Sequence, residues 1–147
     1  MQGDSVTGAV WNDYAEYREA EAIEPGYILC EKGDGSLYKS TKRCQEFAGV
    51  SSDTWGFAQG ETEKAKTPIA VSGRVLVYVK DKVKVNDYIC SGPDGIGLKM
   101  HWWEKILYPH RVVGIVSEIP TYEKWGGGDG ADRSPVDVNG RIWIKVR

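Results

Sequence analysis

The sequence predicts a mainly β fold, a compact barrel or sandwich of short strands and hairpins with one short helix near residues 101–108. Glycine is abundant, with 18 among 147 residues, and glycine is typical of tight turns. Six Trp and eight Tyr carry the aromatic content, against two Phe. Aromatic and β-branched residues favour strands. A third observation, an internal repeat, points the same way.

The repeat joins two stretches that read almost alike, residues 68–79 and 135–146. Both contain Pro-x-x-Val-(Ser/Asn)-Gly-Arg followed by alternating β-branched residues. Ser-Gly and Asn-Gly are turn dipeptides, so each stretch is predicted to form a short strand, a tight turn and a longer strand. We therefore expect β-hairpins at Val71–Val79 and Val138–Val146 in related positions of one sheet system. Because side chains alternate along a strand, one face of the first repeat should carry Val75, Val77 and Val79. The equivalent residues of the second repeat are Ile142, Ile144 and Val146.

Further strands are separated by turn residues. Gly33, Asp34 and Gly35 predict a turn between two strands of a hairpin. Residues 112–118 form a near-continuous apolar run of strand length, so this strand is expected to be central and covered on both faces. The predicted strands of this group are Gly26–Glu31, Leu37–Ser40, Thr54–Ala58, Tyr88–Cys90 and Val112–Glu118.

One helix is predicted at His101–Tyr108, lying over the sheet edge. Its apolar residues follow helical spacing, and Pro109 ends the run. The paired Trp102 and Trp103 are expected to seal a core. The alternative is that they stack on sugar rings together with Trp125, which would make the chain a carbohydrate-binding module.

The length of 147 residues predicts a single β-rich domain spanning residues 1–147. Residues 1–12 are a candidate pro-segment. Residues 126–135 contain four glycines, two aspartates and a proline, which predicts a mobile loop. Asp129 and Asp132 in that loop lack the ligand spacing of a known calcium loop, and no metal site is expected.

Charge and cysteine content exclude several classes of partner. The first 35 residues carry eight acidic and two basic side chains, which argues against a nucleic-acid partner. No apolar run reaches the length of a membrane span, so no membrane partner is expected. Cys30, Cys44 and Cys90 show no Cys-x-x-Cys spacing, so buried thiols are expected rather than a zinc site or a disulfide framework.

The motifs of common enzymes are missing from the sequence. It contains no nucleophile elbow, phosphate-binding loop, dinucleotide fingerprint or zinc-protease helix. No cofactor is expected, and no catalyst acting on an external substrate is indicated.

One stretch, Val10–Tyr17, nevertheless suggests chemistry. The side-chain amide of Asn12 can attack its own main-chain carbonyl, which closes a succinimide and releases Asp13 as a new amino terminus. Asp13 and Glu16 could move the protons that this step requires. The alternative is that Trp11, Tyr14 and Tyr17 anchor a first strand.

The same stretch carries a family resemblance. Asn-Asp-Tyr-Ala-Glu-Tyr at residues 12–17 resembles the start of the autoproteolytic intramolecular-chaperone domain of phage tailspike and neck-appendage proteins. Asp13, Ala15 and Glu16 match the motif, and Asn12 stands at the residue before the cut. Residues 52–58 and 111–117 are similar to internal strands of that family.

The resemblance implies a small β-rich domain at the end of a fibrous trimer, which promotes assembly and cuts itself free once. We therefore expect a homo-oligomer, a trimer, with other phage structural proteins as partners, located in the virion after synthesis in the host cytoplasm. Cleavage at Asn12–Asp13 would make the chain a single-turnover autoprotease with Asn12, Asp13 and Glu16 as site residues. It would release only the twelve residues of this sequence that precede Asp13. The alternative is a purely structural role of the same residues.

Overall fold

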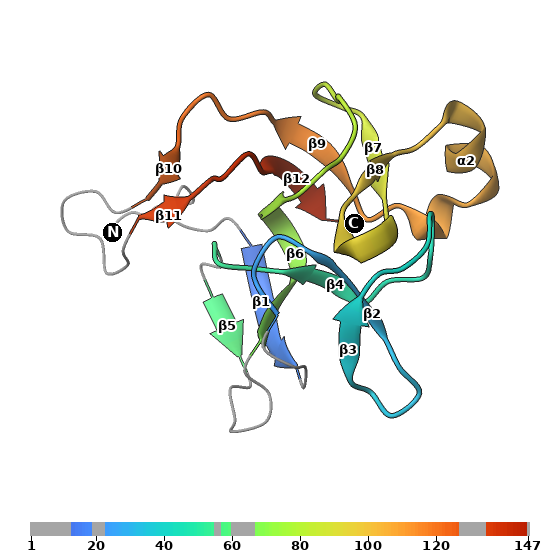
Figure 1. The fold of residues 1–147 in the computed structure, drawn as a ribbon, viewed down its shortest axis with the longest axis horizontal. Coiled ribbons are helices and arrows are strands. Elements are labelled where there is room, and N and C mark those ends of the chain that lie inside the picture. The colour runs from blue at the N-terminus through green and yellow to red at the C-terminus, as the bar shows by residue number, and fades with distance from the viewer. Residues whose placement is uncertain (1–12, 19–22, 55–56, 60–66, 127–134, 147) are drawn as a thin grey trace.

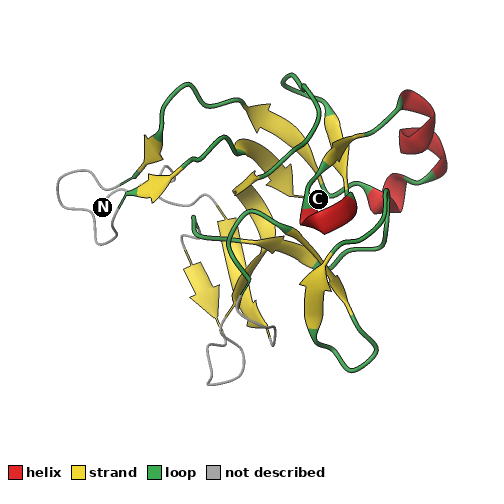
Figure 2. Ribbon diagram, in the orientation of Figure 1, coloured by secondary structure: helices red, strands yellow, loops and turns green. Residues whose placement is uncertain are grey.

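The computed structural model describes residues 13–18, 23–54, 57–59, 67–126 and 135–146. Within these ranges, ten strands form one curled sheet, and two short strands form a separate ribbon (Figures 1 and 2). The sheet curls into a half-barrel, mostly with antiparallel neighbours. The prediction of a mainly β fold with one short helix near residues 101–108 is confirmed.

The main path of the sheet runs through eight strands. Their order is β3 (Leu37–Lys39), β2 (Ile28–Glu31), β4 (Gly49–Ser51), β6 (Thr67–Val77), β12 (Ile142–Val146), β9 (Gly114–Glu118), β7 (Tyr88–Cys90) and β8 (Leu98–Lys99). Two further strands extend the sheet beside β6. They are β1 (Asp13–Arg18), antiparallel to β6, and β5 (Phe57–Gln59), parallel to β1.

The ribbon and the helical segments lie outside this path. The ribbon pairs β10 (Lys124–Trp125) with β11 (Val136–Asp137). The helical segments are the α-helix α2 (Trp102–Leu107) and the 3-10 turns η2 (Pro93–Gly95) and η3 (Pro109–Arg111). Among the residues described, no helix is long and apolar enough to cross a membrane.

The two halves of the repeat do occupy related positions. The strands β6 and β12 are antiparallel neighbours, with Val75 opposite Ile144 and Val77 opposite Ile142. These four residues contribute to one buried cluster, against which Val79 packs. The predicted shared face is therefore confirmed. The cluster consists of Ile28, Val50, Ala70, Val75, Val77, Ile89, Val113, Val116, Ile142, Ile144 and Val146.

The prediction of two hairpins is wrong. Strand β6 continues through Ser72 and Gly73, because both residues pair with β1, where a register shift absorbs the local irregularity. Gly73 has a φ of +89°, yet it stays within the strand, opposite Asp13 of β1 and Val146 of β12. The extra residue of the β-bulge is Val71, between Ala70 and Ser72. The Asn139–Gly140 turn does form, with φ values of +52° and +78°. The strand before it, β11, pairs with β10 instead of β12.

Most other elements lie where the sequence predicts them. The hairpin of β2 and β3 and the strand β7 are confirmed. Strand β5 begins at Phe57 rather than Thr54, and residues 55–56 lie outside the described ranges. Strand β9 lies between β12 and β7 as expected. Its Ile115 and Ser117 are only partly buried, so one face is incompletely covered. Most of the predicted loop at residues 126–135 lies outside the described residues.

Curling brings the two ends of the sheet together. The Ser40 hydroxyl, directly after β3, donates to the Gly92 carbonyl at 2.7 Å. The Gly95 amide in η2 donates to the Ser40 carbonyl at 3.0 Å. The β3 end of the sheet therefore contacts the segment that links β7 to β8. The two ends are closed on each other by side-chain and turn contacts rather than by strand pairing.

Candidate functional site

Strand β1 holds two of the three predicted cleavage residues. Asp13 is its first residue and pairs with Gly73 of β6, while Glu16 pairs with Ile69 of β6 and Gln59 of β5. The Glu16 side chain is exposed to solvent. Asn12 and Trp11 lie outside the described residues, as do the side chains of Tyr14 and Tyr17. The structure therefore places Asp13 and Glu16 on one strand, three residues apart.

The pairing of β1 limits where its main chain can be distorted. From Asp13 onward the strand is flanked by β6, and Tyr14–Glu16 are also flanked by β5. Paired strand backbone is held extended. The strain that a self-cleaving Asn12–Asp13 bond needs would therefore have to arise on the Asn12 side of the bond.

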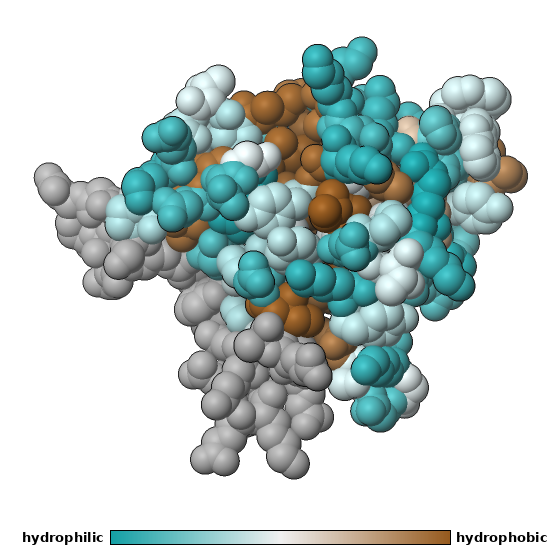
Figure 3. Space-filling model, in the orientation of Figure 1, coloured by the Kyte–Doolittle hydropathy of each residue, from teal (hydrophilic) through white to brown (hydrophobic). Residues whose placement is uncertain are grey.

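The helix α2 presents an apolar surface to solvent, which we call the α2 surface. In Figure 3 this helix lies at the right-hand margin, where neutral and hydrophobic surface reaches the outline. Its members and their exposed fractions are Trp102 71%, Trp103 43%, Ile106 69%, Leu107 61% and Tyr108 42%. The expectation that Trp102 and Trp103 seal a core is therefore wrong.

The buried position of α2 is occupied by a carboxylate instead. Glu104 is 3% exposed and receives two hydrogen bonds from Arg43, from Nε at 2.9 Å and from Nη2 at 2.7 Å. The His101 amide also donates to Glu104, at 2.7 Å. The hydrogen bonds from Arg43 lower the pKa of Glu104 from its ordinary value of 4.5 to about 2. Because this charged pair fixes α2 to the β3–β4 loop through Glu104, the aromatic residues of the helix remain exposed to solvent.

Trp125 lies apart from the other two tryptophans. It is in β10, at the opposite side of the molecule from α2 (Figure 1). Its ring packs edge-on against Trp143, with ring centroids 5.4 Å apart. The three predicted stacking residues therefore do not form one platform. Only Trp102 and Trp103 are neighbours, and Trp103 stacks on His101 at 5.7 Å.

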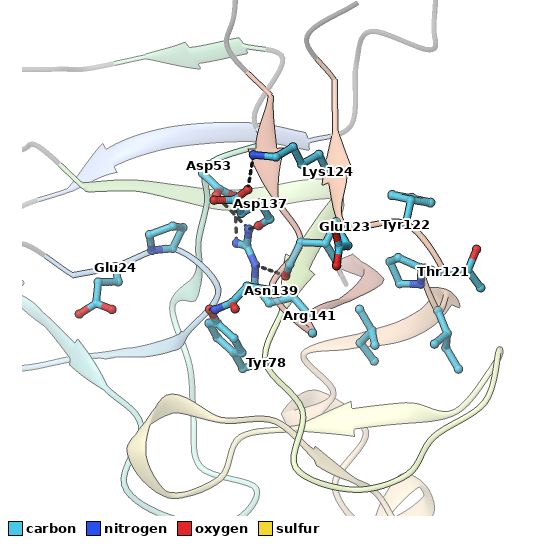
Figure 4. Close-up of a pocket in the computed structure, with 16 residues that line it drawn as sticks. Glu24, Asp53, Tyr78, Thr121, Tyr122, Glu123, Lys124, Asp137, Asn139 and Arg141 are labelled. Carbon is cyan, nitrogen blue, oxygen red and sulfur yellow. Dashed lines mark hydrogen bonds and ion pairs between the residues drawn. The ribbon is translucent and has the colours of Figure 1, made fainter.

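A polar groove of about 790 Å³ was not predicted from the sequence. It lies between the β10–β11 ribbon and the turn before β12 (Figure 4). At its floor, Arg141 is 3% exposed and donates to both carboxylate oxygens of Asp53, each at 2.9 Å. Its remaining donations go to the carbonyls of Val138 and Asp137. The Gly-Arg pair shared by the repeat was the signal in the sequence that could have marked this residue.

The charges of the groove are largely paired. Lys124 contacts Asp137 at 2.8 Å, and the Asn139 amide donates to the Tyr78 hydroxyl at 2.6 Å. Among the described residues that line the groove, the cations are Lys124 and Arg141, and both are ion-paired. In the described part of the chain, no group of three or more His, Cys, Asp or Glu side chains is placed to hold a metal ion. The groove is a structural feature of the β11–β12 turn.

No known family model and no curated protein sequence matches the chain. Its fold is similar to that of two solved structures of bacteriophage phi29 gene product 12. The C-terminal fragment of that protein has a TM-score of 0.62 at 18% identity, and the match covers 92% of this chain and 100% of the fragment. The pre-mature form has a TM-score of 0.63 at 20% identity, and the match covers 100% of this chain and 23% of that protein.

At these identities the likeness establishes a shared fold. It extends over the whole C-terminal fragment, so the similarity involves a complete structural unit rather than one supersecondary motif. The chain spans about a quarter of the length of pre-mature gene product 12.

Proposed function

We propose that this chain is a structural and assembly module of a bacteriophage particle, the end domain of a trimeric tail fibre, spike or head projection. The observation that carries the proposal is the fold likeness to the complete C-terminal fragment of phi29 gene product 12. The resemblance of residues 12–17 to the phage family motif supports it independently, because it rests on the sequence and not on the fold. The partners proposed are two further copies of the chain and other phage structural proteins, and the location is the virion.

The α2 surface supports self-association. Five apolar or aromatic residues gather on one short helix and its C-terminal end, and Ile106 and Trp102 are the most exposed of them. Large exposed apolar patches mark interaction sites, and Trp and Tyr are enriched at the centres of subunit contacts. The occupant that we assign to this surface is a second copy of the same chain, with three copies arranged around one axis.

An assembly assay tests this function. Two proteins would be expressed: the part of phi29 gene product 12 that precedes its C-terminal fragment, and the same part fused to this chain. Sedimentation would then compare their yields of soluble trimer. If the chain is an assembly module, the fusion gives trimer in severalfold higher yield than the part of gene product 12 expressed alone. Equal yields would contradict the proposal.

A second candidate function is self-cleavage at Asn12–Asp13, which would make the chain a single-turnover intramolecular chaperone. The sequence motif favours it, because Asp13, Ala15 and Glu16 match the cleavage motif of the phage family and Asn12 stands at the residue before the cut. The likeness to a protein known both in pre-mature form and as a C-terminal fragment supports it as well. In this role Asn12 attacks its own carbonyl, and Asp13 or the exposed Glu16 transfers the proton.

Intact-mass measurement of the purified chain tests self-cleavage. An active chain slowly yields a product that begins at Asp13, and Asn12→Ala stops the reaction while Glu16→Gln slows it. If Asp13 is the attacking group instead, the Asp13→Ala variant is not cleaved, whereas the Asn12→Ala variant still is. A chain that stays uncut for days at 37 °C, both alone and fused to the part of gene product 12 that precedes its C-terminal fragment, leaves only the structural role.

The carbohydrate-binding alternative receives less support. Trp102 and Trp103 are exposed, but Trp125 packs against Trp143 on the opposite side of the molecule. Of the three predicted stacking residues, Trp102 and Trp103 are therefore the two that one sugar chain could contact together. Titration with oligosaccharides, followed by tryptophan fluorescence, would reveal such binding as a saturable change.

A further inference from the structure

Two of the three thiols form a close pair. The Sγ atoms of Cys44 and Cys90 lie 2.8 Å apart, although the residues are 46 positions apart in the chain. Both are free thiols. A disulfide has an S–S length of about 2.05 Å, so bond formation needs an approach of only about 0.8 Å. We propose that Cys44 and Cys90 form an intramolecular disulfide when the folded protein meets an oxidant.

The two backbones around this pair are already held together. The Cys44 amide donates to the Ser91 carbonyl at 3.1 Å. The Ser91 hydroxyl accepts from the Gln45 amide at 2.7 Å and donates to the Lys42 carbonyl at 2.8 Å. These bonds join the loop that contains Cys44 to Ser91, the residue directly after Cys90. These hydrogen bonds hold the chain segments that carry the two thiols next to each other.

The conformation of Cys44 is a separate observation. Its φ of +52° lies in the left-handed region that residues other than glycine seldom adopt. Arg111 holds it there, since its Nη1 donates to the Cys44 carbonyl at 2.7 Å. Such a strained residue persists where its surroundings determine it, and strained residues concentrate at functional positions.

The exposure of the two thiols fixes the order of the chemistry. Cys44 is partly exposed, whereas Cys90 is fully buried. With a small disulfide as the oxidant, the Cys44 thiolate attacks one sulfur, forms a mixed disulfide and releases one small thiol, which takes up the proton of Cys44. The Cys90 thiolate then attacks the Cys44 sulfur and releases the second small thiol with the other proton. The protein loses two hydrogens, and the oxidant is reduced to two thiols.

The environment makes this pair slow to react. Burial raises the pKa of both thiols, and the hydrogen bond from Cys44 to Glu104 at 3.3 Å favours the protonated form of Cys44. Because the thiolate is the nucleophile, the exchange is slow at neutral pH. The pair therefore acts as a stabilising cross-link and not as a rapid redox sensor.

The bond would lock the curled sheet. Cys44 belongs to the loop between β3 and β4, and Cys90 ends β7, near the other end of the strand order. These ends meet only through side-chain and turn contacts. The disulfide would make that closure covalent. If the chain is a virion protein, as proposed above, the bond would form after release from the reducing host cytoplasm.

Oxidation of the folded protein by oxidised glutathione tests the proposal. After treatment, the chain is unfolded, alkylated with iodoacetamide and digested for mass spectrometry. The expected result is a peptide pair joined through Cys44 and Cys90, with Cys30 alkylated and the protein lighter by two hydrogens. The unfolding midpoint in urea also shifts upward, and reduction reverses the shift.

The controls separate a specific pair from random oxidation. Cys30→Ser retains the bond, whereas Cys44→Ser and Cys90→Ser both lose it. The urea-unfolded chain, oxidised in parallel, should give all three pairings, so the comparison remains informative if a variant fails to fold. Three alkylated cysteines in the folded, treated protein would overturn the proposal, as would a bond that includes Cys30 or joins two molecules.

Discussion

Leu76 and Trp143 lie directly opposite each other in the neighbouring strands β6 and β12. They also occupy the same position in the two copies of the repeat. Val77 faces Ile142 and Val75 faces Ile144 on either side of them, so these paired strand segments of the two copies are related by a local two-fold axis through this pair. Both side chains are fully buried, on the face away from the main cluster, with Val136 and Val138.

Trp143→Ala should destabilise the fold strongly. The ring is fully buried, its Nε1 donates to the Tyr122 hydroxyl at 2.8 Å, and the Arg74 guanidinium lies over it at 4.6 Å. Removing a buried Trp ring leaves a cavity, and we expect a loss of about 3–5 kcal/mol in the free energy of unfolding. Urea unfolding measures this loss. Ile119→Ala, at a 44% exposed position, is the control, and an equal effect of the two variants would contradict the assignment.

Glu104→Gln should change the pH dependence of stability. Because hydrogen bonds from Arg43 lower the pKa of Glu104 to about 2, its carboxylate stabilises the folded chain above about pH 5, and this contribution is lost as the pH falls through 2. The variant should be less stable by about 2–3 kcal/mol at neutral pH, with a difference that shrinks toward pH 2. Urea midpoints at several pH values test this.

Glu46→Gln is the matched control for Glu104→Gln. The Glu46 side chain is 83% exposed and lies 3.7 Å from Arg111. Exposed pairs of this kind contribute little. The control should follow the unmodified chain at every pH, and a Glu104→Gln difference that stays constant from pH 7 to pH 2 would refute the role of the Glu104 charge.

Arg141→Lys should destabilise the β11–β12 turn. A lysine cannot reproduce the two parallel hydrogen bonds to Asp53 or the donations to the Val138 and Asp137 carbonyls. We expect a loss of about 2–4 kcal/mol in the free energy of unfolding. The equivalent change in the other copy of the repeat, Arg74→Lys, affects a 3.3 Å pair with Glu118 that is about 40% exposed. It also keeps a cation at the position that faces the Trp143 ring. It should cost less than about 1 kcal/mol, and a reversed ranking would contradict this account.

Ile106→Glu should prevent self-association without unfolding the chain. Ile106 is 69% exposed, so a charge there costs little in the monomer but would be desolvated in a subunit contact. Sedimentation should show smaller assemblies for this variant, with an unchanged circular-dichroism spectrum. Ile119→Glu, outside the α2 surface, should leave the assembly intact. If both variants assemble like the parent chain, the α2 surface is not the contact.

The sequence correctly predicted the elements that are determined by neighbouring residues in the chain. The strand at Tyr88–Cys90 has the predicted bounds, and the predicted helix lies within residues 101–108, because periodicity and Pro109 define them. The Ser72–Gly73 dipeptide was misread because its pairing with Asp13 and Tyr14 in β1 depends on a strand nearly sixty positions earlier. The dipeptide is compatible with a turn, and its pairing with β1 and β12 keeps it within a strand.

Partners distant in sequence determined the rest. Trp102 and Trp103 face solvent because Glu104 finds Arg43 at a separation of 61 positions. Arg141 is buried because it meets Asp53 at a separation of 88 positions. The Cys44–Cys90 contact spans 46 positions. Each of these contacts follows from the curl of the sheet, which no single segment encodes.

Sedimentation equilibrium of the unmodified chain tests the central claim most directly. If the chain is an assembly module of a trimeric fibre or spike, the measured molar mass should be three times the chain mass of 16.3 kDa. This mass should stay constant across the micromolar range of protein concentration. A species of 16.3 kDa throughout that range would contradict the proposed function.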